Sequence, residues 1–415
     1  MDASVILFVL KAYQSKTGVS CLRVLFIPNV GAVIPHLLPL MALDSQLEAG
    51  RHETAFLVPG AFHKSLKNLQ RNVLDIDYRP EQLFRDEMAA CGRFRPDVIV
   101  DDFSMAALLT SKVAKKPRVT ILRTGAFPGS VPRDDSHRHS CESHSSDKFD
   151  FDAYFQNSEL LCGIPAPKNF AEACAADISI VPGIRSIEAL PASVGDDPNY
   201  AFAGALTVSD SAIPTPVARS TDTTDAILAF LERNQQRKIV YLTLGSVLKA
   251  GEAIREAIKY MLDTGVAIIS TVDLPDVKTS RKELFFYAPF VPMHAVCSKV
   301  HLMIHHCGSG TYQYAITHQV PSICIGSRSY DRDDVAYRLE QLGVAKYIPF
   351  IDSVAVFIER FVKEFDQCMD NLGQWYQAAK QRLNLLWNEN DRTAAIFNFE
   401  EVLKKAILLH GANLK

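Results

Sequence analysis

Short apolar runs rich in β-branched residues alternate with helical patterns along the first part of the chain. Runs of this kind are typical of strands buried in a parallel sheet, and the stretches between them supply the crossover helices. Met105–Lys116 is one such helical stretch. The alternation predicts an α/β domain wound around a parallel sheet. Its predicted strands are Arg23–Pro28, His52–Val58, Val73–Ile76, Asp97–Asp101 and Arg118–Leu122.

The alternation stops in a stretch rich in Ser, Thr and Pro and then restarts. Residues 206–224 are poor in bulky apolar side chains, which is typical of a linker. We predict an N-terminal domain at 1–207, a linker at 208–224 and a C-terminal domain at 225–415, with the last helix able to pack back on the first domain. The second half is predicted to hold strands at Ile239–Leu244, Val266–Thr271, Leu284–Tyr287, His301–Ile304 and Ser322–Ile325, and a helix at Ile254–Leu262.

Length and charge agree with two ordinary globular domains. At 415 residues the chain is longer than one hydrophobic core usually serves. The formal net charge is −3 and no basic stripe is present, which disfavours general nucleic-acid binding. The nine cysteines form no C-x-x-C pair, which indicates a reducing compartment. The cytoplasm is therefore the expected address.

No apolar run is long enough to predict a membrane span. The longest, Val30–Leu43, is interrupted by Pro35, His36 and Pro39. The apolar segment Val5–Leu10 has neither a basic lead nor a small-residue cleavage site, so we expect no signal peptide. Residues 1–22 are compatible with an extra strand or helix, or with a poorly ordered lead.

A polar segment at 133–151 carries several histidines and a cysteine that could ligate a metal. Polar segments of this composition are more typical of solvated loops, so we predict no metal site there.

The loop after the predicted strand His301–Ile304 has the composition of an anion-binding turn. Its glycines allow a tight turn, and a helix that starts near Ser309 or Gly310 would offer free N–H groups and a positive dipole end to a phosphate. A histidine at the strand tip can add a hydrogen bond. The alternative is a simple Gly-Ser helix cap beside a surface histidine. The loop reads His305-His306-Cys307-Gly308-Ser309-Gly310-Thr311.

Further motifs flank this loop, namely Phe290-Val291-Pro292-Met293 before it, and Val320-Pro321, Asp331-Arg332, Ala336-Tyr337-Arg338 and Leu342-Gly343-Val344 after it. Together they resemble the donor-binding signature of family 1 glycosyltransferases, especially the bacterial antibiotic and macrolide enzymes. That signature runs W-V-P-Q, H-x-G-x-G-T, G-V-P, D-Q, A-x-R and L-G-V. The order and spacing match over about fifty residues, with one extra residue before Asp331.

The resemblance implies a GT-B fold, in which two Rossmann-like domains with doubly wound parallel sheets face each other across a cleft. It also implies inverting transfer of a sugar from a UDP- or dTDP-sugar to a hydroxyl of a small hydrophobic acceptor, without a metal or another cofactor. By the same resemblance, the diphosphate is contacted by His306, Gly310, Thr311 and the serine of the Gly245-Ser246 turn, and Gly308 and Ser309 belong to the same donor-binding loop. The base is bound by Phe290 and the Val291 backbone, and the sugar hydroxyls by Asp331, with Arg332 at the next donor-binding position.

Two positions depart from the family pattern. Met293 replaces a glutamine near the base, and Arg332 replaces the glutamine that helps to read the sugar. An arginine fork suits a carboxylate or phosphate better than a neutral hydroxyl. Arg332 could therefore bind an acidic sugar, reach back to the diphosphate, or pair with Asp333 or Asp334 on the surface.

The first domain has a candidate general base in His36, which follows the first predicted strand. Proline replaces the glycine of the family's G-H-x-x-P motif, but the His-x-x-Pro spacing to Pro39 is kept. Histidine titrates near neutral pH, so it can take the proton of an attacking hydroxyl. Asp101 and Asp102 end the fourth strand and point in opposite directions, so one of them would support His36. We favour Asp102; the alternative is that both cap a helix beginning at Ser104.

Two other functions compete with this interpretation. The same fold could act on a lipid-linked acceptor, but the first helix has almost no Lys or Arg to bind a membrane surface. The chain could instead be a non-catalytic partner protein that binds a nucleotide, and the presence of His36 argues against this.

Overall fold

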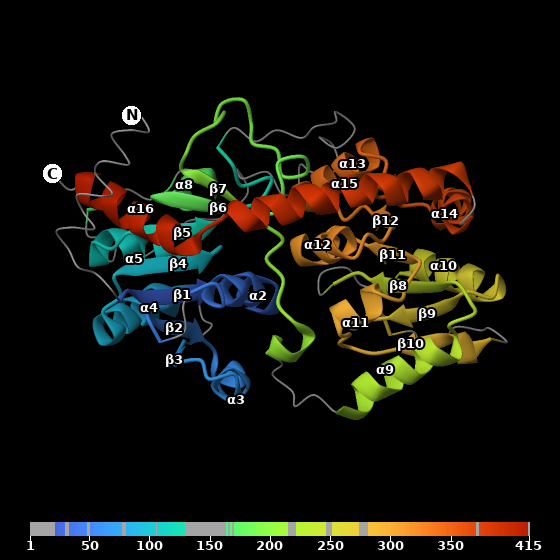
Figure 1. The fold of residues 1–415 in the computed structure, drawn as a ribbon, viewed down its shortest axis with the longest axis horizontal. Coiled ribbons are helices and arrows are strands. Elements are labelled where there is room, and N and C mark those ends of the chain that lie inside the picture. The colour runs from blue at the N-terminus through green and yellow to red at the C-terminus, as the bar shows by residue number, and fades with distance from the viewer. Residues whose placement is uncertain are drawn as a thin grey trace.

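The computed structural model describes residues 21–29, 33–47, 50–76, 80–104, 106–128, 163–164, 167, 170–214, 221–245, 251–273, 281–370 and 373–413. These residues form two parallel sheets side by side, each covered by helices (Figure 1). The predicted polar segment at 133–151 and most of residues 1–22 lie outside the described residues.

The first sheet has seven strands in the order β3-β2-β1-β4-β5-β6-β7. Its first six positions follow the doubly wound order 3-2-1-4-5-6, in which ligands bind where the winding reverses, between the ends of β1 and β4. The strands are β1 (Arg23–Pro28), β2 (Glu53–Val58), β3 (Val73–Asp75), β4 (Val98–Asp102), β5 (Arg118–Ile121), β6 (Ile178–Pro182) and β7 (Tyr200–Gly204). The helices are α2 (Val33–Asp44), α3 (Gly60–Asn68), α4 (Pro80–Phe94), α5 (Ala107–Ala114) and α8 (Phe170–Ala173).

The second sheet has six strands in the order β10-β9-β8-β11-β12-β13. This is again the doubly wound order, with the reversal between β8 and β11. The strands are β8 (Ile239–Thr243), β9 (Ala267–Ser270), β10 (Phe285–Tyr287), β11 (Leu302–His305), β12 (Ser322–Ile325) and β13 (Ala345–Ile348). The helices around it are α9 (Thr221–Arg233), α10 (Glu252–Asp263), α11 (Met293–Cys297), α12 (Ser309–Thr317), α13 (Tyr330–Gln341) and α14 (Val354–Met369), and short 3₁₀ turns lie at Asp210–Ala212 and Lys282–Leu284.

The predicted strands coincide with observed strands to within a few residues, and β1 has the predicted bounds. The sequence pattern missed β6, β7 and β13. The strand β7 (YAFAG) consists mainly of small residues, and β13 (AKYI) has four residues, so neither gives a strong apolar run. The predicted helix at Met105–Lys116 begins two residues late, at Ala107.

The predicted linker is only partly separate from the domains. Val208 and Ile213 are buried in the core of the first sheet, and α9 begins at Thr221. The domain boundaries at 207 and 225 stay predictions. Among the described residues, no helix is long and apolar enough to cross a membrane.

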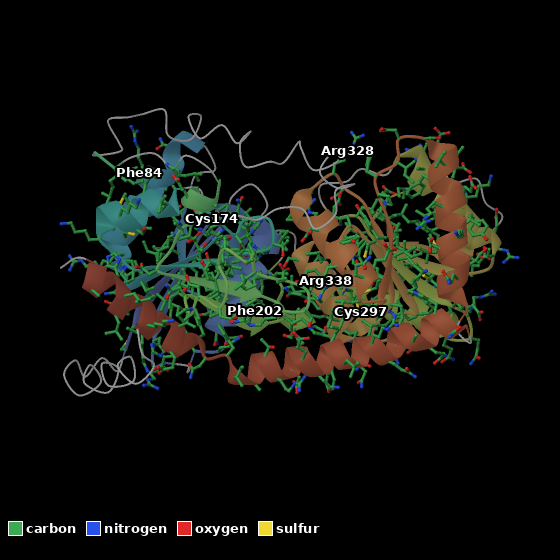
Figure 2. The ribbon with its side chains drawn as sticks, turned by 90° about the horizontal axis from the view of Figure 1, so that it is seen from above. Phe84, Cys174, Phe202, Cys297, Arg328 and Arg338 are labelled. Carbon is green, nitrogen blue, oxygen red and sulfur yellow. The ribbon has the colours of Figure 1, made fainter. Side chains whose placement is uncertain are left out.

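Two C-terminal helices join the domains. The helix α15 (Gln374–Ile396) runs along both of them, and α16 (Phe399–Asn413) lies across the first sheet (Figures 1 and 2). Gly204 at the end of β7 allows close approach of α15, because a Cβ there would lie 3.1 Å from the Asn390 carbonyl oxygen. Asn390 Oδ1 accepts a hydrogen bond from Ala205 N at 2.7 Å.

Side chains from the second domain also bond the first domain directly. Arg338 Nε, near the domain junction in Figure 2, donates to the Ser186 carbonyl at 2.7 Å, and Gln313 Oε1 accepts from Leu206 N at 3.0 Å. Ser186 Oγ donates to Glu389 of α15 at 2.5 Å. The domains are therefore held together by polar contacts as well as by the shared helix.

We expect Phe399→Ala to destabilise the protein by about 3–5 kcal/mol, the usual cost of removing a buried phenylalanine. Phe399 is 1% exposed and its ring lies 6.2 Å from that of Phe26 in the core of the first sheet. Ile396→Ala is the matched control, because Ile396 ends α15 with 84% exposure and should change stability by less than about 0.5 kcal/mol. Denaturant midpoints measure both; equal midpoints would contradict the docking of α16.

Candidate active site

A histidine–aspartate pair lies at the reversal point of the first sheet. His36 is in the first turns of α2, after β1, and Asp102 is the last residue of β4, the neighbouring strand. His36 Nδ1 lies 2.9 Å from Asp102 Oδ1. The His36 side chain keeps 20% exposure, whereas Asp102 is fully buried. The His36 ring is therefore partly accessible to solvent, while its Nδ1 is held by the buried Asp102 carboxylate.

The protonation of Asp102 decides how His36 is oriented. Burial would raise the pKa of Asp102, but the charge of Arg123 and the hydrogen bonds from Arg123 and His36 outweigh it, and the pKa is lowered. An ionised carboxylate only accepts hydrogen bonds, so His36 Nδ1 must donate. In the neutral ring this leaves a lone pair on Nε2, the nitrogen that can accept a proton.

Asp101 has a different set of partners from Asp102. Its carboxylate is buried against Arg118, which donates from Nε at 2.8 Å and from Nη2 at 3.0 Å. It also accepts from Ser104 N at 3.1 Å, but α5 begins at Ala107 and not at Ser104. Strand alternation thus separates the two carboxylates as expected, and Asp102 is the one beside His36.

The glycine-rich loop lies at the reversal point of the second sheet. It connects β11, which ends at His305, to α12, which begins at Ser309 with Gly308 as its N-cap. No side chain caps this described helix start. A Cβ at Gly310 would meet nothing within 4 Å, so the first turn borders open space. A helix N-terminus of this kind can bind an anion through the N–H groups of its first turn.

His306 is enclosed by two glycines of this loop region. A Cβ on Gly245 would lie 2.5 Å from His306 Cε1, and one on Gly308 would lie 3.2 Å from Nε2. Burial and the positive charge of Arg332 lower the pKa of His306 to about 4, with Asp331 opposing the shift. The ring is therefore neutral at physiological pH and has a single N–H. A hydrogen bond between this ring and the Thr243 backbone also opposes the lowering of the pKa.

Asp331 and Arg332 lie in the first turn of α13, near His306. Arg332 Nε lies 4.0 Å from Asp331 Oδ2, and Ser329 Oγ donates to Asp331 Oδ1 at 2.5 Å. Asp333 is buried and accepts from the backbone N–H groups of Ser327 and Arg328 at 2.8 and 3.1 Å. The charge of Arg332 lowers the pKa of His306, so the two side chains are near each other. Asp333 holds the loop that precedes α13.

The remaining predicted site residues have varied environments. Phe290 is half-buried against the hydrophobic cluster of the first sheet, and Val291 is buried in the core below β8 and β11. Thr311 is partly buried, and its N–H bonds the Gly308 carbonyl at 2.8 Å. Ser246 lies outside the described residues.

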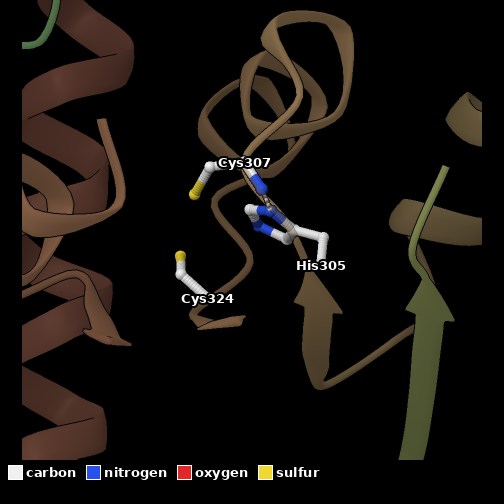
Figure 3. A group of neighbouring side chains, drawn as sticks. All are labelled: His305, Cys307 and Cys324. Carbon is white, nitrogen blue, oxygen red and sulfur yellow. Dashed lines mark hydrogen bonds between the residues drawn. The ribbon is translucent and has the colours of Figure 1, made fainter. Parts of the chain in front are cut away.

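His305, Cys307 and Cys324 form a buried cluster below the loop (Figure 3). Their ligand-capable atoms lie within 4.8 Å of one another. Cys307 N donates to His305 Nδ1 at 3.1 Å, so in the neutral ring the proton is on Nε2. Neither ring nitrogen then has a free lone pair for a metal. Burial also raises the pKa of the Cys307 thiol well above its usual value, which keeps it protonated. The cluster is therefore better described as packed core than as a metal site.

Four polar residues that sequence reasoning missed connect the two halves of the site. Arg123 binds Asp102 through two hydrogen bonds. The next residue, Thr124, donates from N and Oγ1 to Glu188 Oε2 at 2.9 and 2.6 Å. Tyr312 of α12 donates to Glu188 Oε1 at 2.6 Å. Arg123 follows a predicted strand directly and could have been found by that position, whereas Glu188 follows β6, which was not predicted.

Comparisons with known proteins agree with this architecture. No family model matches the sequence. A stretch of 137 residues is 28% identical to an aclacinomycin-T 2-deoxy-L-fucose transferase of Streptomyces galilaeus and covers 30% of each chain. The matches to curated relatives thus span about a third of their length.

Solved structures match over nearly the whole chain. The structure of Medicago truncatula UGT71G1 complexed with UDP-glucose has a TM-score of 0.67 at 14% identity, and covers 94% of this chain and 99% of that one. The glycosyltransferase VinC in complex with dTDP has a TM-score of 0.60 at 17% identity, with 94% and 100% covered. This protein therefore has the GT-B fold, as predicted. The predicted resemblance to antibiotic glycosyltransferases of family 1 is also confirmed.

We expect Gly245→Ala to destabilise the protein, because Gly245 has a φ of +62° and any Cβ would collide with the His306 ring. The left-handed backbone alone costs about 1–2 kcal/mol for alanine. Gly92→Ala is the control: Gly92 lies in α4 with open space around it, so alanine should stabilise by about 0.5–1 kcal/mol. Thermal melts of both variants test this, and a common Tm would count against the placement of His306.

Proposed function

We propose that this protein transfers a sugar from a UDP- or dTDP-sugar to a hydroxyl of a small hydrophobic acceptor, with inversion and with His36 as general base. The observation that carries the proposal is the pairing of two half-sites. A histidine–aspartate pair lies at the reversal point of one sheet, and a glycine-rich anion-binding loop lies at that of the other. The relative's name, a sugar transferase acting in aclacinomycin chemistry, supports an acceptor of natural-product type.

The acceptor hydroxyl would be deprotonated as its oxygen attacks the anomeric carbon. His36 Nε2 takes the proton, and Asp102 stabilises the imidazolium that results. The oxygen–carbon bond forms as the bond from carbon to the diphosphate breaks on the opposite face, which inverts the configuration. The nucleoside diphosphate leaves with the electron pair.

The negative charge on the leaving diphosphate would be stabilised by groups of the second domain. The first turn of α12 offers N–H groups, His306 donates one hydrogen bond from its neutral ring, and Arg332 adds a full positive charge nearby. Asp331 accepts hydrogen bonds from sugar hydroxyls, and Phe290 and the Val291 backbone bind the base. This donor set supplies the electrostatic stabilisation without requiring a metal ion.

The direct test is a screen of UDP- and dTDP-sugars against hydrophobic alcohols and phenols, with products detected by mass spectrometry. A product heavier than the acceptor by one sugar residue, with release of UDP or dTDP, is expected. Donor hydrolysis alone, or no turnover with any pair, would contradict the proposal.

We expect His36→Ala to lower kcat by roughly 10²–10⁴, the usual contribution of a general base, and to leave donor affinity unchanged. The matched control is His410→Ala. His410 of α16 also forms a histidine–aspartate pair, because it is 19% exposed and lies 3.4 Å from Asp177. This control should keep the wild-type rate. Rates come from product formation, and donor affinity from calorimetry. Full activity in the His36 variant would rule out its role as base.

His306→Ala should weaken UDP or dTDP binding by about 1.5–3 kcal/mol, the value of a hydrogen bond to a charged oxygen. Since the pKa of His306 is about 4, this contribution should stay constant between pH 6 and 8. The control is His301→Ala, just before the opposite end of β11, where Nδ1 accepts from Ile239 N at 3.1 Å. Calorimetry with the nucleotide alone isolates the phosphate contact. Equal affinities in the two variants would remove His306 from the donor site.

A further inference from the structure

Arg123 occupies the carboxyl end of the first sheet, directly behind the histidine–aspartate pair. Its Nη1 lies 2.5 Å from Asp102 Oδ1 and its Nη2 lies 2.6 Å from Oδ2. The same Oδ1 accepts from His36 Nδ1 at 2.9 Å. A planar two-point contact prevents rotation of the carboxylate, so the oxygen that faces His36 is fixed in place.

The surroundings hold the Arg123 side chain in this position. Its guanidinium lies 5.5 Å from the centre of the Phe103 ring, whose edge contacts His36 at 5.8 Å between ring centres. The charges of Glu188 and Asp331 also face it. Thr124, the next residue, is anchored on Glu188. Arg123 is only 8% exposed, so these contacts act with little screening from water.

The charge of Arg123 has a consequence that a histidine–aspartate pair alone would not have. A bare buried carboxylate would strongly stabilise the imidazolium form of His36 and so hold a proton on the base at neutral pH. Arg123 offsets that negative charge. The positive charge of Arg123 therefore opposes a second positive charge on His36 and favours a free Nε2 lone pair for an acceptor hydroxyl.

We propose that Arg123 is a positioning residue of the transfer reaction, which holds the Asp102 carboxylate against His36 and offsets its charge. This inference rests on the proposed role of His36 as base. Arg123 acts through Asp102 and does not itself touch the reacting atoms. It therefore has two separable effects, one on orientation through its fork and one on protonation through its charge.

The test compares Arg123→Gln and Arg123→Lys with the wild type. Glutamine removes the charge, so the acid limb of the kcat/KM profile should move to higher pH by roughly 1–2 pH units. Lysine keeps the charge but not the fork, so the limb should stay in place while kcat falls roughly 10–100-fold. Wild-type kcat in the lysine variant would overturn the role of the fork, and an unmoved limb in a folded glutamine variant would overturn the role of the charge.

Arg118→Gln is the matched control for loss of a buried arginine. Arg118 forms the same kind of fork, on Asp101, and is 2% exposed, but Asp101 points away from His36. It should destabilise the fold to a similar degree and leave the acid limb in place. An equal shift in this variant would mean that the limb reports general destabilisation, and the proposal would fail.

A second readout does not depend on activity. In protein labelled with ¹⁵N-histidine, the His36 resonance is identified by its loss in His36→Ala and then titrated in the wild type and in Arg123→Gln. The midpoint should move upward by the same roughly 1–2 pH units. If the wild type transfers no sugar, the proposed function fails, while this titration still decides whether Arg123 controls the protonation of His36.

Discussion

The whole site depends on one buried carboxylate at the domain junction, that of Glu188. Glu188 is 1% exposed and accepts hydrogen bonds from Thr124 of the first domain and Tyr312 of the second. A buried charge is tolerated only when it is fully bonded, so both domains must supply their donors at once. Gly183 leaves room for this contact, since a Cβ there would lie 2.8 Å from the Tyr312 hydroxyl oxygen. The junction thus fixes α12, and with it the glycine-rich loop, relative to the strand end that carries Arg123.

Much of the fold could be predicted from the sequence because parallel strands are buried on both faces. The β1 sequence RVLFIP and the β8 sequence IVYLT are continuous apolar runs, and such runs are visible without knowledge of their neighbours. The strand β7 could not be predicted in this way. Its sequence YAFAG is set by close contact with α15, nearly two hundred residues further along the chain. Its small residues allow the close approach of α15, and this contact produces no periodic pattern in the sequence.

The candidate site likewise has features that could be predicted from the sequence and features that could not. His36, Asp102 and the loop around His306 belong to local motifs at strand ends, so their positions could be found from the resemblance of these motifs to the family pattern. Their strain and protonation could not. Phe103 and Cys307 have φ values of +58° and +56°, and each follows the end of a strand at a reversal point. Left-handed backbone at a non-glycine residue persists only where surrounding contacts enforce it. Here the Asn29 side chain donates a hydrogen bond to the Phe103 carbonyl, and His305 accepts one from the Cys307 N–H. No sequence pattern predicts these contacts.

Arg332 is the position where charge decides between alternatives that the sequence leaves open. An acidic sugar, the donor diphosphate and a surface pairing with Asp333 or Asp334 all remained compatible with the motif. Asp333 and Asp334 are both buried, and Asp333 is occupied by the backbone of Ser327 and Arg328, so neither offers a surface pairing. Arg332 instead lies near enough to His306 to lower its pKa. Next to a neutral histidine, the guanidinium is a full positive charge that an anion bound nearby would offset. Under the proposed function this arrangement favours the diphosphate, because His306 belongs to the same loop as a helix N-terminus that can bind phosphate. In the proposed reaction Arg332 would then strengthen the binding of the leaving group, while Asp331 would contact the sugar.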